Sequence, residues 1–124
     1  MHLVLSECCT NPIRLGVEDG TIPDDNITAS SNWEDQDIST PAGSRLNKPD
    51  PGLTVVGGWA PAASNANQWI QVDLGRPTCV HGVLMQGRAE GVQWVTRFRV
   101  QYRSSPTAAL TDVLDPHADC AVQV

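Results

Sequence analysis

Short stretches in which apolar and polar residues alternate recur along the chain. Residues 68–75, QWIQVDLG, place Ile70, Val72 and Leu74 at every second position, with polar residues between them. A period of two is typical of a strand with one buried side and one side facing solvent. The pattern predicts a strand over residues 69–74 whose three aliphatic side chains face the core.

Four segments carry this strand-like character: residues 26–31, 69–74, 79–86 and 94–103. In the last, one side holds Thr96, Phe98, Val100 and Tyr102, and the other holds Arg97, Arg99, Gln101 and Arg103. Long polar connections over residues 32–44 and 48–68 separate the segments. Short strands joined by irregular loops indicate an all-β sandwich or barrel.

Composition excludes several classes of function. The chain has 124 residues, which favours one domain, and its 8 basic against 14 acidic residues give a net charge of −6. We therefore expect no nucleic-acid partner, because phosphate binding needs a basic patch. No apolar run approaches the roughly 20 residues that span a bilayer. The opening residues MHLVLSE are too short for a complete signal peptide, so a secreted form would need further sequence before Met1.

The candidate chemistry is sparse. Four cysteines are compatible with disulfides or with a metal site, and Asn26-Ile27-Thr28 is a potential N-glycosylation acceptor that weakly supports secretion. The three histidines have no visible triad partners, and neither a G-x-S-x-G motif nor a P-loop occurs. We therefore predict that the protein is not an enzyme.

Eight short motifs together carry a family resemblance. They are LGVEDGTIP (15–23), ITASS (27–31), SRLN (44–47), GGWAP (57–61), QWIQVDLG (68–75), QGR (86–88), WVT (94–96) and VQY (100–102). In this order and at this spacing they resemble the discoidin family, also called the coagulation factor V/VIII C-type domains. The resemblance covers residues 9–103, and residues 104–124 are interpreted as an atypical tail or linker.

The resemblance implies an all-β, distorted jelly-roll barrel or sandwich with recognition loops at one end. Family members bind anionic phospholipid, galactose-type sugars, collagen or other proteins, and they occur in secreted or cell-surface proteins. The family continues through further strands after the one that matches residues 100–102. We therefore expect this domain to lack its final strands and to expose strand edges and part of its core.

Several residues of the motifs are interpreted as structural. Within QWIQVDLG, Trp69 would cover the barrel edge and Asp73 would hydrogen-bond neighbouring loops. Trp59 in GGWAP would seal the core where glycines let two backbones approach closely. Arg45 in SRLN is expected to pair with a carboxylate such as that of Glu18 or Asp19.

The resemblance assigns ligand recognition to three loops, here called the first loop (32–40), the second loop (48–56) and the third loop (87–93). The candidate ligand-binding residues are Trp33, Asp37 and Ile38 in the first loop, Leu53, Val55 and Val56 in the second, and Arg88, Glu90 and Val92 in the third. This mixture of aromatic, charged and apolar groups suits a sugar or a protein loop.

Anionic lipid fits the first loop less well. Burial of Trp33 and Ile38 would contribute about 3–6 kcal/mol at most. Anionic lipid adds roughly 1 kcal/mol for each nearby Lys or Arg. The first loop carries three carboxylates and no base, so this electrostatic contribution has the wrong sign. The three carboxylates could hold calcium, but their spacing matches no defined calcium loop, and no cofactor is expected.

The family's disulfide joins a cysteine near the start to one at the end. Cys9 matches the first of these, and Cys120 is the candidate partner in place of the missing one, with a free Cys9 as the alternative. Cys79 is interpreted as a buried thiol. A zinc site built from Cys8, Cys9, His117 and Cys120 would lack a C-x-x-C knuckle and is not favoured.

The sequence thus favours an extracellular, non-catalytic binding module that recognises a cell-surface or matrix glycan or protein through its loops. One alternative is a peripheral phospholipid-binding module of the clotting-factor type. Others are an accessory carbohydrate-binding module of a larger enzyme, and a partial gene product without a separate function.

Overall fold

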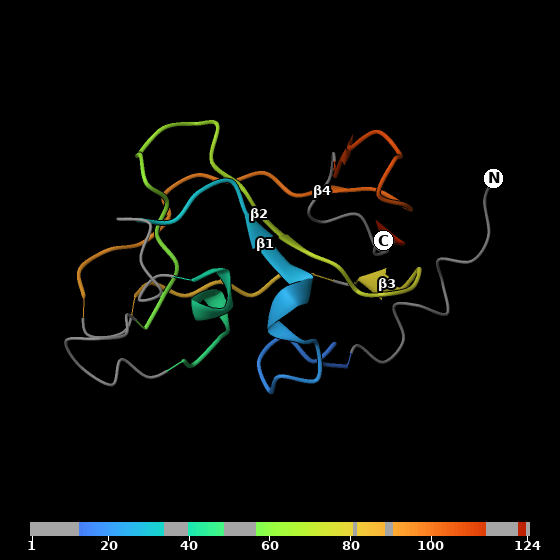
Figure 1. The fold of residues 1–124 in the computed structure, drawn as a ribbon, viewed down its shortest axis with the longest axis horizontal. Coiled ribbons are helices and arrows are strands. Elements are labelled where there is room, and N and C mark those ends of the chain that lie inside the picture. Colours follow the sequence, from blue (N-terminus) through green and yellow to red (C-terminus); the bar gives the residue numbers. More distant parts are fainter. Residues whose placement is uncertain are drawn as a thin grey trace. The chain divides into compact units, whose positions relative to one another are not determined.

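Short antiparallel strands and single 3₁₀ turns make up the described part of the chain (Figure 1). The computed structural model describes residues 13–33, 40–48, 57–80, 82–88 and 91–113, together with the backbone of 122–123. The elements are η1 (Asp24–Asn26), β1 (Ile27–Ala29), η4 (Pro41–Ser44), β2 (Ile70–Val72), β3 (Cys79–Val80), β4 (Gln101–Tyr102), β5 (Thr111–Asp112) and β6 (Val122–Gln123). The expectation of an all-β, discoidin-like fold is confirmed.

The strands form three two-stranded antiparallel sheets, β1–β2, β3–β6 and β4–β5. The chain divides into two compact units: unit 1 comprises residues 1–13, 74–84 and 96–124, and unit 2 comprises residues 14–73 and 85–95. The β1–β2 sheet belongs to unit 2, and the other two sheets belong to unit 1. Each described strand has one ladder partner among the described residues.

All four predicted strand segments contain an observed strand, but each observed strand is shorter. The segment 79–86 is a strand only over β3, and 94–103 only over β4. A strand needs a ladder partner as well as alternation, and alternation is all that a sequence displays. The pairing of β4 continues by one bond, because the N–H of Val113 donates to the carbonyl of Val100 at 3.0 Å.

The β1–β2 sheet is extended by bonds at both ends. Ile27 lies opposite Val72, and Ala29 lies opposite Ile70. Beyond the ladder, the N–H of Asp73 donates to the carbonyl of Asn26 at 2.8 Å, and the side-chain amide of Asn26 donates back to the carbonyl of Asp73 at 3.0 Å. The glycosylation candidate Asn26 therefore uses its amide nitrogen to hold the end of this sheet. The expected bonding of Asp73 to a neighbouring segment is confirmed for its backbone.

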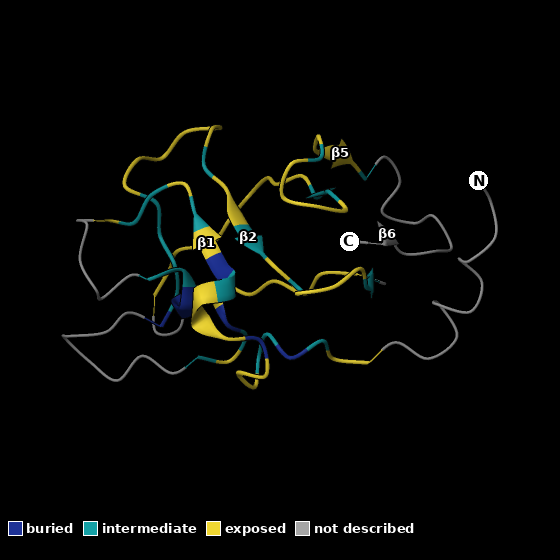
Figure 2. Cartoon of the chain, turned by 45° about the vertical axis from the view of Figure 1, so that its right-hand side comes forward, coloured by how far each residue is buried: buried dark blue, intermediate teal, exposed yellow. Residues whose placement is uncertain are grey.

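The core of unit 2 surrounds a buried arginine. Figure 2 shows buried residues gathered around β1, where Ile27 is only 3% exposed. Arg45 is 8% exposed, and its guanidinium donates to the carbonyls of Val17 at 2.5 Å and Ile22 at 2.8 Å. It also donates to the Asp24 carboxylate at 2.5 Å. The planar fork of five N–H groups suits several fixed acceptors at once.

The structural role of Arg45 is confirmed, but the expected partner was wrong. Its carboxylate partner is Asp24, because the chain enters η1 immediately after the carbonyl of Ile22 that the same guanidinium binds. Glu18 instead bonds Arg14 and Asn47, each at 2.6 Å. Asp19 accepts the backbone N–H of Thr21 at 2.9 Å.

The expectation that Ile70, Val72 and Leu74 all face the core was wrong for Ile70. Val72 and Leu74 are half-buried, whereas Ile70 is 38% exposed and Trp69 is 51% exposed. In the part of the chain that the structure describes, β2 pairs only with β1, where Ile70 lies opposite Ala29. Phe98, Trp94 and Leu84 are likewise exposed, at 62%, 67% and 83%.

Cys79 corrects a second expectation. It opens β3, is half-buried, and is disulfide-bonded, so it is not a free buried thiol. The pairing candidates Cys9 and Cys120 lie outside the described residues.

Replacement of the buried guanidinium tests this account of the core. We expect Arg45→Ala to lower the free energy of unfolding by about 2–4 kcal/mol, because it leaves two backbone carbonyls and a carboxylate without their donor. Urea denaturation followed by circular dichroism measures the change. Arg14→Ala, which removes an exposed ion pair, is the control and should cost less than about 1 kcal/mol. Equal losses in the two variants would contradict the central role of Arg45.

The Arg45–Asp24 pair also predicts a dependence of stability on pH. The hydrogen bond from Arg45 holds the pKa of Asp24 below its usual value of 3.8. A folded-state pKa below the unfolded one stabilises the fold above pH 3.8, and this contribution disappears as the pH falls through the folded-state pKa.

Acid titration of the unfolding midpoint measures this contribution. We expect Asp24→Asn to lose less stability on acidification than the parent chain. The neighbouring substitution Asp25→Asn, which leaves the Arg45–Asp24 pair intact, is the matched control. Superimposable curves for the parent chain and Asp24→Asn would refute the assignment.

Candidate functional site

The structure describes three of the nine candidate ligand-binding residues. They are Trp33 of the first loop and Arg88 and Val92 of the third loop, all in unit 2. The remaining six lie outside the described residues: Asp37, Ile38, Leu53, Val55, Val56 and Glu90.

The base of the first loop is fixed by the GGWAP segment. The N–H of Trp33 donates to the carbonyl of Ala60 at 2.8 Å. The indole N–H of Trp59 donates to the carbonyl of Ser31 at 3.1 Å and to the side chain of Asn32 at 3.2 Å. Trp59 is half-buried, and Trp33 is 44% exposed. Trp59 therefore has the expected structural role, and it leaves the Trp33 ring open to solvent.

The polar residue that opens QWIQVDLG braces the same loop. Gln68 accepts hydrogen bonds from the hydroxyls of Ser30 at 2.8 Å and Ser31 at 2.7 Å. The Ser31 hydroxyl in turn accepts the N–H of Ala62 at 3.0 Å. These bonds join the end of β1 to the chain that leads into β2. The segment 68–75 thus supports the loop bases, as its interpretation as a structural element predicts.

The third loop closes on itself through Arg88. The N–H of Arg88 donates to the carbonyl of Gln93 at 2.9 Å, and its guanidinium donates to the Gln93 side chain at 2.9 Å. These two bonds hold the ends of the loop together. Val92, which directly precedes Gln93, is 90% exposed.

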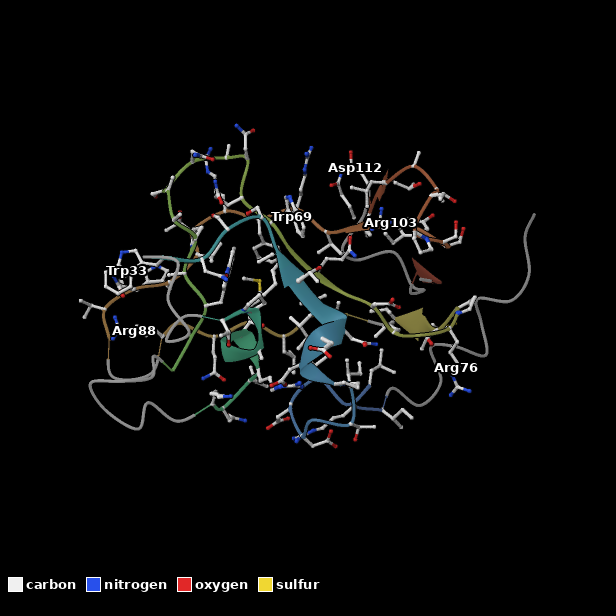
Figure 3. All side chains as sticks on the ribbon, in the orientation of Figure 1. Trp33, Trp69, Arg76, Arg88, Arg103 and Asp112 are labelled. Carbon is white, nitrogen blue, oxygen red and sulfur yellow. The ribbon has the colours of Figure 1, made fainter. Side chains whose placement is uncertain are left out.

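Close backbone contacts connect the two loops. A methyl group on Gly58 would lie 3.8 Å from the Cα of Arg88, so the two residues are neighbours. A methyl group on Gly43 of η4 would lie only 2.8 Å from the carbonyl oxygen of Gly58. The segment 57–60 therefore contacts η4, the first loop and the third loop. Figure 3 shows the labelled Trp33 and Arg88 on the same side of unit 2. We call these two residues, with Val92, the loop rim.

A separate shallow depression of about 400 Å³ lies beside β1, and sequence reasoning did not anticipate it. Its lining residues are Asp24, Asp25, Ile27, Thr28, Thr40, Pro41 and Ala42. The consecutive aspartates before the ITASS motif were the available signal. Within the described ranges, no three His, Cys, Asp or Glu residues come together as a metal site. No helix among the described residues has the length and apolarity to cross a membrane.

Comparisons with known proteins agree with these motifs. The family model of the F5/8 type C domain matches residues 26–118. Bovine lactadherin is 33% identical over 116 residues, which cover 89% of this chain and 26% of lactadherin. Mouse retinoschisin is 34% identical over 95 residues, covering 73% of this chain and 40% of retinoschisin. Hemocytin of Bombyx mori is 37% identical over 92 residues, covering 74% of this chain and 3% of hemocytin.

The chain therefore spans less than half the length of each of these curated relatives. No solved structure matches the chain.

The close approach of Gly43 to Gly58 yields a test of how the rim is built. Gly43→Ala should lower the free energy of unfolding by roughly 1–3 kcal/mol, because the new methyl group meets a backbone oxygen that cannot rotate away. Gly82→Ala is the matched control, since a methyl group there would meet no atom within 4 Å. Thermal unfolding of both variants measures the difference. Similar melting temperatures would show that the Gly43 contact can relax without cost.

Proposed function

The chain belongs to the F5/8 type C domain family, and we propose that it is an extracellular, non-catalytic binding module. It recognises a glycan or a protein on a cell surface or in the matrix through the loop rim. The observation that carries this proposal is the exposed ring of Trp33 on a hydrogen-bonded base, beside the third loop that bears Arg88 and Val92.

The fixed base favours recognition because little order has to be gained on binding. The first loop is held at Trp33 by Ala60 and at Ser31 by Trp59 and Gln68. Binding groups that are already ordered lose less conformational entropy when a ligand arrives. An aromatic ring presents an apolar face to sugar C–H groups or to a protein side chain, and a guanidinium adds directed hydrogen bonds.

The extracellular location is supported by the disulfide at Cys79. Disulfides persist in secreted and cell-surface proteins and are rare in reducing compartments. The sequon at Asn26 is compatible with the same location.

Backbone and side-chain hydrogen bonds with Thr21 lower the pKa of Asp19, and the hydrogen bond from Arg45 lowers the pKa of Asp24. Both carboxylates thus form bonds that maintain the fold.

A phospholipid surface is the second candidate, favoured by the exposed apolar side chains of Trp33 and Val92. Arg88 is the one cation of the described loop rim, and its guanidinium already bonds Gln93. A single arginine adds roughly 1 kcal/mol of attraction to anionic lipid. Apolar insertion would therefore have to supply most of the affinity.

Truncation of the rim tests the proposal. Trp33→Ala and Arg88→Gln should each weaken binding to the ligand found on arrays of glycans and matrix proteins by about tenfold or more, as central contacts do. Surface plasmon resonance measures the affinity, and circular dichroism checks that the variants remain folded. Trp69→Ala is the matched control, because Trp69 is an equally exposed tryptophan outside the loop rim.

Three outcomes decide between the candidates. Loss of affinity in both rim variants, with the control unchanged, supports the proposal. Co-sedimentation with phosphatidylserine vesicles that depends on Trp33, without any array ligand, favours the phospholipid candidate. Equal effects of Trp33→Ala and Trp69→Ala on every ligand would exclude the loop rim as the binding site.

A further inference from the structure

A network of polar bonds connects the start of the third loop to the turn that contains Glu18. The backbone N–H of Asn47 donates to the side-chain oxygen of Gln86 at 2.9 Å. The side-chain amide of Asn47 donates to the carboxylate of Glu18 at 2.6 Å, and the other oxygen of that carboxylate accepts the guanidinium of Arg14 at 2.6 Å. All four residues belong to unit 2. Asn47 thus bonds two segments that are far apart in the sequence.

The backbone of Asn47 adopts an unusual conformation. Among the described residues it is the one non-glycine residue with a positive φ, at 57°. Asparagine tolerates this left-handed region better than most residues do. Arg45, two residues earlier, donates to the carbonyl of Val17, which directly precedes Glu18. The segment 45–47 is therefore fixed at two points to residues 17–18, and it presents the N–H of Asn47 to Gln86 from a fixed position.

The two arms of the third loop pack against each other. A methyl group on Gly87 would lie 3.0 Å from the carbonyl oxygen of Gln93 and 3.3 Å from the Cβ of Trp94. Arg88 bonds Gln93 through both its backbone N–H and its guanidinium. Gln86 directly precedes these contacts, so its bond to Asn47 attaches the paired arms to the segment 45–47.

The placement of these arms determines where Arg88 lies relative to Trp33. Both residues contact the segment 57–60: Ala60 accepts the N–H of Trp33, and a methyl group on Gly58 would lie 3.8 Å from the Cα of Arg88. The second contact is of the van der Waals type, which has little directionality, whereas a hydrogen bond restricts both distance and angle. The bond between Asn47 and Gln86 supplies that restriction.

We propose that Asn47 and Gln86 are positioning residues of the loop rim. Their hydrogen bond holds the third loop against the segment 57–60 and thereby sets the separation of Arg88 from Trp33. The inference rests on the proposed function where it concerns ligand binding, because binding groups displaced by about 1 Å lose their fit to the ligand. The placement of the loop itself can be measured without a ligand.

Nuclear magnetic resonance of the full chain measures that placement. Gln86→Met removes the acceptor at nearly constant side-chain length, so the nuclear Overhauser contacts between the protons of Gly58 and Arg88 should be lost. Contacts between Arg88 and Gln93 should remain, because the two arms pair with each other directly. Gln86→Glu should restore the contacts between Gly58 and Arg88, since a carboxylate oxygen accepts the same N–H.

Affinity gives the second measurement, by surface plasmon resonance with the ligand selected from arrays of glycans and matrix proteins. Gln86→Met should weaken binding roughly threefold to tenfold, the equivalent of one hydrogen bond. Asn47→Gly permits the same backbone conformation but removes the bond to Glu18. It should add no effect in the Gln86→Met background, because Asn47 acts through Gln86. Gln101→Met, which removes a side-chain bond to Asp112 in unit 1, is the matched control and should change neither measurement.

The outcomes separate this inference from the proposed function. Retention of the contacts between Gly58 and Arg88 in Gln86→Met, or failure of Gln86→Glu to restore them, would overturn the inference. Additive effects of Asn47→Gly and Gln86→Met on affinity would also overturn it. If no array ligand binds the parent chain, the proposed function fails, and the proton contacts still decide the placement of the loop. Matching circular dichroism spectra confirm that the variants preserve the fold.

Discussion

The buried guanidinium of Arg45 is the constraint on which the rest of unit 2 depends. A charge removed from water is stable only when fixed acceptors replace its hydration. Here those acceptors are the carbonyls of Val17 and Ile22 and the carboxylate of Asp24. Because Arg45 directly follows η4, these bonds join η4 to the turn that leads into β1. The orientation of β1, and of β2 paired with it, thus depends on the acceptors that the Arg45 guanidinium binds.

Close backbone contacts also connect this core to the first and third loops. Gly43 lies inside η4 and touches the carbonyl of Gly58, and the segment of Gly58 in turn holds Trp33 and contacts Arg88. A side chain at Gly43 would meet the carbonyl oxygen of Gly58 at 2.8 Å, so this contact favours glycine, whereas a methyl group at Gly58 would lie in ordinary contact with Arg88 at 3.8 Å. Backbone hydrogen bonds therefore fix the bases of the loops. The residues of the loops themselves can vary, as expected where binding residues lie on loops of a rigid scaffold.

The sequence alone predicted the strands and the structural residues, but not all of the residues with which they make contact. Alternation located β1 and β2, and the motifs correctly indicated structural roles for Arg45 and Trp59. The choice of Asp24 over Glu18 or Asp19 depends on a turn in which Gly16 adopts a φ of +95° and Thr21 packs against it. No pattern of residues along the sequence predicts the path of the backbone through this turn. The exposure of Ile70 and the disulfide of Cys79 likewise depend on which distant segments come together, and alternation alone carries no such information.

Net charge describes the chain as a whole and not any one segment of it. An acidic total argues against a nucleic-acid partner, yet a field at the surface is set by charges within about a Debye length, roughly 8–10 Å at physiological salt. Arg97 and Arg99 are exposed in the segment before β4, whereas the four residues 100–103 are all half-buried. The loop rim depends on an exposed ring and directed hydrogen bonds rather than on net charge, so ionic strength affects it little.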